Sequence, residues 1–158
     1  MIVSMQLSKN FTLNELTKTQ TAVRNGIDNT PGPTEIENLK KLVTNVLQPI
    51  RDNYGRAVFV SSGFRSISIN SLVGGSANSD HVRGMAADIE IPGVDNKELT
   101  LWIRDNLKFS QLILEFYVDG DPDSGWVHVA YNENKLVKEC LTARRGTNGR
   151  TVYLPGIN

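Results

Sequence analysis

The hydrophobic pattern of this chain changes its period about one third of the way along, and that change restricts the folds the chain can adopt. Before residue 54, apolar residues recur at helical spacing, at Ile36, Leu39, Val43, Val46 and Ile50. After residue 57, several short segments rich in strand-forming residues alternate between apolar and polar positions. Helical spacing followed by strand spacing predicts an α+β fold, with a mostly antiparallel sheet flanked by helices.

Two capping boxes and one proline predict where the first helices begin and end. Thr12 and Glu15 have the spacing of a capping box, and Thr34 and Glu37 repeat it. A short helix is therefore expected from about residue 12, and the main amphipathic helix from about residue 34. Pro49 is expected to kink or end that main helix, because proline lacks the backbone N–H that a helix interior requires.

The second half of the chain predicts strands separated by loops. Strands are expected at 57–61, 87–91, 111–116 and 126–131. A short helix is expected at 67–72, and another helix is expected to begin at Asp95 and Glu98. Segments 74–81 and 119–125 are polar and glycine-rich, which predicts loops. In the third strand, alternation assigns Leu112, Leu114 and Phe116 to the apolar face, while Asn148-Gly149 predicts a hairpin in the tail.

Composition narrows both the domain organisation and the class of partner. The 158 residues carry 17 basic and 17 acidic side chains, a balance that argues against nucleic-acid binding. Cys140 is the only cysteine, so no intrachain disulfide is expected. We expect a single monomeric domain over residues 1–158, with a helical N-terminal part at 11–54, a motif core at about 57–131 and a C-terminal tail at 132–158.

The first residues and the hydropathy suggest where the protein is made. The segment 1–9 lacks the basic start and the apolar run of a secretory signal, and no apolar run is long enough to span a membrane. We therefore expect synthesis in the cytoplasm without a signal peptide, and no membrane partner.

Two histidines and one aspartate stand out as candidate metal ligands. His81 lies in a polar loop, Asp88 lies early in a strand, and His128 lies on a later strand. A buried carboxylate must be solvated, paired or bound to a cation. Two imidazoles and one carboxylate leave a fourth position open, as in catalytic zinc sites, although residues of these types also occur in ordinary surfaces and cores.

The surrounding motifs resemble those of the M15 family of zinc D-Ala-D-Ala carboxypeptidases and the related phage endolysins. The motifs are SGFRS at 62–66, VGGS at 73–76, SDHVRGMAAD at 79–88 and GWVHV at 125–129, and the resemblance spans about residues 10–131. It implies a fold like the DD-peptidase/hedgehog domain, zinc (Zn²⁺) bound by His81, Asp88 and His128, and an arginine, Arg65, beside the scissile carbonyl. Gly84 is expected to be the turn residue between His81 and Asp88.

One position departs from the pattern of the family. Many members carry an acidic residue three positions before the second histidine, where this chain has Gly125. Glu115 is our candidate for the general base, because it emerges from a strand expected beside the one carrying His128, and some branches of the family resemble this arrangement. The competing acids are Asp119, Asp121 and Asp123 in the loop that follows.

Three further positions have both a functional and a structural interpretation. Ser79 could contact substrate or hydrogen-bond its own loop, and Trp126 could line a substrate pocket or belong to the core. The tail arginines Arg144, Arg145 and Arg150 could attract anionic wall polymers, although a solvated tail is the simpler interpretation.

The resemblance implies zinc-dependent hydrolysis of an amide bond in the peptide stems of bacterial peptidoglycan. The bond could be D-Ala-D-Ala or L-Ala-D-Glu. A phage-type lysis enzyme that acts on the wall after release, or a virion-associated one, fits the missing signal, and a cytoplasmic bacterial dipeptidase-like role is the other open setting. One alternative is a catalytically silent, metal-containing wall-binding or virion structural protein. A serine hydrolase using Ser62 or Ser79 with His81 is weaker, because no nucleophile elbow is present.

Overall fold

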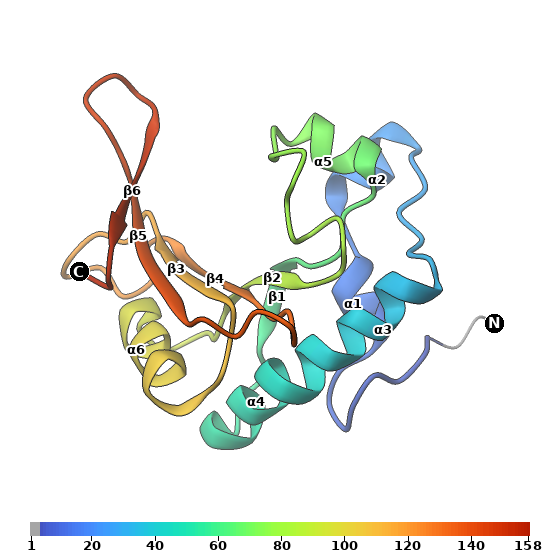
Figure 1. Cartoon of the computed structure of the whole chain (residues 1–158), viewed down its shortest axis with the longest axis horizontal. Helices are drawn as coiled ribbons and strands as arrows, with labels where there is room; N and C mark the ends of the chain where they lie inside the picture. Colours follow the sequence, from blue (N-terminus) through green and yellow to red (C-terminus); the bar gives the residue numbers. More distant parts are fainter. Residues whose placement is uncertain (1–3) are drawn as a thin grey trace.

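The computed structural model describes residues 4–158 (Figure 1). Residues 1–3, which begin the segment 1–9 that lacks the features of a secretory signal, lie outside the described residues. The helices are α1 (Leu13–Thr17), α2 (Gln20–Asn25), α3 (Pro33–Leu42), the π-helical segment η1 (Val43–Leu47), α4 (Gln48–Tyr54), α5 (Ile67–Leu72) and α6 (Asn96–Asn106). The strands are β1 (Phe59–Ser62), β2 (Ala86–Glu90), β3 (Gln111–Glu115), β4 (Trp126–Ala130), β5 (Glu139–Arg145) and β6 (Thr151–Pro155). None of the helices in this part of the chain is long and apolar enough to cross a membrane.

All six strands form one sheet in the order β1-β2-β4-β3-β5-β6. The pairs are antiparallel except for β3 and β5, which run parallel. The expectation of an α+β fold with a mostly antiparallel sheet is confirmed. The C-terminal segment is part of that sheet, because β5 pairs directly with β3 and the hairpin expected at Asn148-Gly149 joins β5 to β6.

One face of the sheet forms the hydrophobic core. Its inward side chains are fully buried and come from alternate positions of the central strands: Ala87, Ile89, Leu112, Val127 and Val129. They pack with apolar residues of the continuous helix α3–α4 and of α6, which lie on the same side of the sheet (Figure 1). Alternation leaves the intervening residues of β2, β3 and β4 on the opposite face.

The first helix begins as predicted, and the main helix does not. Thr12 caps α1, with Glu15 completing the capping box. The capping box expected at Thr34 is wrong, because α3 begins one residue earlier at Pro33 with Gly32 as its cap. Proline at the first helical position needs no N–H partner and has a backbone angle already suited to the helix, so no side-chain cap is required.

Pro49 does not end the main helix. The π-helical segment Val43–Leu47 comes immediately before it, and the helix continues as α4 to Tyr54. The wider π turn changes the hydrogen-bond register where proline cannot donate, so the chain passes Pro49 without a break. The helix ends at Gly55, whose φ of 63° is left-handed.

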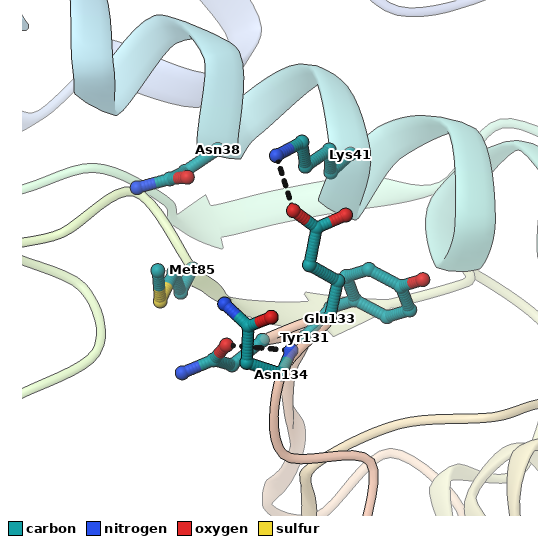
Figure 2. A pocket seen from close by; sticks show the side chains of 7 residues that line it. Asn38, Lys41, Met85, Tyr131, Glu133 and Asn134 are labelled. Atoms are coloured by element: carbon teal, nitrogen blue, oxygen red, sulfur yellow. Dashed lines mark hydrogen bonds and ion pairs between the residues drawn. The ribbon is translucent and has the colours of Figure 1, made fainter.

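Helix α3 also holds the loop that leads into β2. The Asn38 amide donates to the carbonyl oxygen of Arg83 over 2.9 Å, and Lys41 pairs with Glu133 over 2.7 Å. Figure 2 shows the Lys41–Glu133 pair beside a small polar cavity of about 160 Å³ between α3 and the turn after β4. The loop residue Gly84 packs directly against this helix, since a Cβ added there would lie 2.6 Å from the Glu35 carbonyl oxygen.

Two separate features therefore require glycine at position 84, and mutation can separate their contributions. Its φ is +72°, as expected for a turn residue, and its Cβ position is filled by helix backbone. Gly84→Ala should lower the free energy of unfolding by about 2–5 kcal/mol, combining left-handed strain with overpacking. Gly55→Ala is the matched control, because its φ is +63° and nothing lies within 4 Å of the added Cβ. Gly55→Ala should lower the free energy of unfolding by only about 1–2 kcal/mol. Chemical denaturation measures both variants. Equal losses would show that the contact with α3 contributes nothing.

Candidate metal centre

Three side chains with metal-ligand atoms converge on the sheet face opposite α3–α4 and α6. His128 Nδ1 lies 2.9 Å from Asp88 Oδ1, and His81 Nε2 lies 3.4 Å from the same oxygen. All three residues are at least nine-tenths buried. Within residues 4–158 they are the only group of three or more such side chains whose ligand atoms lie close enough to share an ion. Two imidazoles and a carboxylate form a donor set suited to zinc with an open position.

The strand register and one loop hydrogen bond produce this convergence. Asp88 and His128 stand directly opposite each other in the antiparallel β2–β4 pair. His81 comes from the preceding loop, where its Nδ1 lies 2.7 Å from the Gly63 carbonyl oxygen. A carbonyl can only accept, so Nδ1 carries a proton and Nε2 is the ring nitrogen that faces Asp88. Such a contact orients a metal-binding imidazole.

The Asp88 carboxylate and the His128 imidazole stabilise each other's charged forms. Burial alone would raise the pKa of Asp88, but hydrogen bonds from His128 and His81 outweigh burial and hold it well below its usual range. Burial alone would lower the pKa of His128, but the Asp88 carboxylate raises it. The centre therefore favours positive charge beside Asp88, and a divalent cation could replace the proton of His128.

Arg65 lies at the edge of the cluster and is held in place from two sides. Its Nη2 is 3.9 Å from Asp88 Oδ2, its Nε donates to Ser62 Oγ over 3.1 Å, and its Nη1 donates to Asn70 Oδ1 over 3.1 Å. Asn70 is buried and donates in turn to the Ser76 carbonyl oxygen. Burial lowers the pKa of the Arg65 guanidinium, while the charges of Asp88 and Glu115 oppose that shift.

The two candidate serine nucleophiles have other hydrogen-bond partners. Ser62 Oγ accepts from Arg65, and Ser79 Oγ accepts from the backbone N–H of His81 over 3.2 Å. Both ring nitrogens of His81 face Gly63 and Asp88 instead. This arrangement does not form a serine–histidine catalytic pair.

Glu115 projects from β3 onto the same face as the cluster. Its strand neighbour Ile113 stands opposite His128, and Glu115 stands opposite Trp126, whose Nε1 donates to Glu115 Oε2 over 2.7 Å. Burial, followed by the charge of Asp88, raises the pKa of Glu115 above its ordinary value. The competing acids of the following loop, Asp119, Asp121 and Asp123, are exposed and do not line the cleft described below.

The structure explains why residue 125 is glycine. Its φ is +65°, and an added Cβ would lie 2.0 Å from the carbonyl oxygen of Glu115, so no acidic side chain fits there. The end of β3 also corrects one prediction, because Phe116 does not continue the apolar face. Its φ of 56° ends the strand and places its ring 5.4 Å from that of Trp126.

A cleft of about 820 Å³ lies over the cluster. All seven predicted site residues line it, namely His81, Asp88, His128, Arg65, Glu115, Ser79 and Trp126. The opposite rims are the loop 73–79 and the hairpin β5–β6, which contributes Leu141, Thr151 and Tyr153. Sequence reasoning missed these three residues, and it missed Asn70. The Asn148-Gly149 turn predicted the hairpin, but nothing local to the tail indicated that it would reach the site.

The model of the family described as Peptidase M15 matches residues 9–130. No curated protein matches the chain. The matched segment contains every predicted site residue and ends at the last residue of β4, so β5 and β6 lie beyond it.

Proposed function

The chain belongs to the M15 peptidase family, and from this membership we propose that it is a zinc-dependent peptidase that hydrolyses an amide bond in the peptide stems of bacterial peptidoglycan. The observation that carries the proposal is the convergence of His81, Asp88 and His128 at the floor of a cleft that Arg65 and Glu115 also line. These residue types provide the ligands, the charge and the proton acceptor that metal-assisted amide hydrolysis requires.

In this proposal each group has one chemical task. A zinc ion held by the two imidazoles and the carboxylate would supply Lewis acidity and an acidified water. Glu115 accepts the proton of the attacking water and returns it to the leaving amine; its raised pKa suits both steps. Arg65, held by Ser62 and Asn70, stabilises the negative charge that develops on the carbonyl oxygen.

The proposal also covers which peptide bond is cleaved and in which biological setting the enzyme acts. The proposed bond is D-Ala-D-Ala or L-Ala-D-Glu, and the proposed setting is phage-type lysis or a virion-associated enzyme, with a cytoplasmic bacterial dipeptidase-like role as the alternative. Purified peptidoglycan digested with and without chelator, followed by mass spectrometry of the fragments, identifies the bond directly. A protein that binds zinc but releases no fragment would instead be the silent, metal-containing alternative.

The proposed ligands predict how zinc content responds to mutation. Wild-type protein should bind one zinc per chain, and His81→Ala, Asp88→Ala and His128→Ala should each lose most of the metal and the hydrolytic activity, because a three-ligand site cannot spare a ligand. Elemental analysis after dialysis measures the content. Asp105→Ala, which removes an exposed acid, is the control and should keep full zinc. Stoichiometric zinc in all three ligand variants would refute the assignment.

Replacing the proposed base should separate turnover from metal binding. Glu115→Gln keeps the size of the side chain and an oxygen that can accept from Trp126, so zinc content and thermal stability should stay near wild type. Turnover should fall by roughly two or more orders of magnitude, because the proton acceptor is lost. Asp121→Asn is the matched control in the exposed loop and should keep wild-type kinetics. The opposite result, with Asp121→Asn inactive, would assign the base to the loop.

Arg65 should matter more in the transition state than in substrate binding. Arg65→Ala should lower kcat and kcat/KM together, by roughly 10²–10³-fold, with little change in KM. Arg65→Lys keeps the charge but cannot reach both Ser62 and Asn70 with a planar fork, so it should recover only part of the loss. Normal kcat in Arg65→Ala would show that the arginine only positions its neighbours.

A further inference from the structure

The hairpin β5–β6 extends the functional face of the sheet beyond the segment that matches the family. Strand register aligns Trp126, Glu115, Ala143 and Tyr153 in one row across β4, β3, β5 and β6. Residues aligned in this way share a face of the sheet. The proposed base therefore stands in the middle of a row whose outer half comes entirely from the hairpin.

Tyr153 is the exposed end of that row. Its side chain lines the cleft and the residue is 53% exposed, although it is a large aromatic residue. Only the methyl group of the buried Ala143 stands between it and Glu115 in the row. Burial and the charge of Glu115 raise the pKa of the Tyr153 phenol, so its hydroxyl remains a hydrogen-bond donor.

Arg145 adds a positive charge beside this tyrosine. Alternation along β5 puts Arg145 on the face of Ala143, and it pairs with Thr151, which lines the cleft. Its guanidinium carbon lies 5.3 Å from the centre of the Phe116 ring, and its Nη1 donates to the Gly149 carbonyl oxygen over 3.1 Å. Among residues 4–158 no ion pair joins it to an acidic side chain.

The composition of the hairpin matches an anionic ligand. After Glu139, which begins β5 and accepts a hydrogen bond from the Gln111 amide, the chain has three arginines and neither aspartate nor glutamate, in a protein whose overall charge is zero. Arg144 belongs to the opposite face, since successive residues of a strand alternate. Arg145 is therefore the β5 arginine on the face that also carries the cleft-lining Leu141. Four of its five N–H donors have no protein partner in the part of the chain described.

We propose that the hairpin forms a substrate subsite in which Arg145 pairs with a carboxylate of the bound peptide and the Tyr153 hydroxyl and ring contact the same residue. The subsite rests on the proposed function, because it extends the cleft that would bind the scissile peptide. Arg65 lies on the other side of Glu115, beside the metal cluster, so the two arginines serve different parts of the ligand. Substrates with an acidic residue displaced from the cleaved bond should bind best.

Two peptides and three variants test this subsite. The probe is the stem pentapeptide L-Ala-γ-D-Glu-L-Lys-D-Ala-D-Ala with its glutamyl α-carboxylate either free or amidated. Arg145→Gln should weaken binding of the free-acid peptide on the order of tenfold and change binding of the amide by less than about twofold. Tyr153→Phe should weaken binding of the acid by roughly threefold. Arg144→Gln, which removes the same charge from the other face, should leave both affinities unchanged.

Binding is measured by calorimetry on the zinc-loaded protein with the Glu115→Gln substitution, and hydrolysis on the proteins with Glu115 intact. Arg145→Gln should raise KM for the free acid with kcat nearly unchanged. Equal effects of Arg144→Gln and Arg145→Gln, or equal effects on acid and amide, would overturn the subsite while leaving hydrolysis intact.

The experiments would give a different result if the proposed peptidase function were wrong. In that case the wild-type protein would cut neither peptide, whereas calorimetry would still decide whether Arg145 distinguishes the acid from the amide. Absence of binding by both peptides to the zinc-loaded protein would overturn the subsite as well.

Discussion

The pairing of Asp88 with His128 across β2 and β4 is the constraint on which the rest of the site depends. Because side chains alternate along a strand, a slip of either strand by one residue would turn its ligand into the core and bring its apolar residues to the cleft. The fully buried neighbours Ala87, Ile89 and Val127 prevent that slip, since each would lose its packing against the helices. The hydrophobic core thereby sets the position of two of the three proposed ligands.

The buried polar side chains around this pair form hydrogen bonds with residues outside the metal cluster. The Gly63 carbonyl holds His81, and the Asn70 amide bridges Arg65 to the Ser76 carbonyl. Such contacts matter because an ionised group in a buried position is costly unless it is paired and hydrogen-bonded. They also orient the donor atoms before any ligand arrives, which reduces the reorganisation that binding requires.

Strand β3 connects the metal cluster to the hairpin. Glu115 faces Trp126 on one side and Ala143 on the other, so one carboxylate lies between the floor of the cleft and its outer wall. The family match ends at β4, but the sheet continues for two more strands. In the proposed function, the matched strands perform the chemistry and the added strands select the peptide.

Local features of the sequence determined the elements and the candidate ligands. The capping box at Thr12, the alternation around Asp88 and the motif carrying His81 act over a few residues, so they could be interpreted without a structure. Features that depend on distant contacts were decided only by the tertiary structure. Pro49 lies within a helix because a π turn precedes it, and Gly125 is required because β3 packs against it. Tyr153 lines the cleft, and Arg145 lies on the same face of the sheet, because β5 pairs with β3 in parallel. That pairing joins segments separated by a whole strand and two loops, which no local pattern specifies.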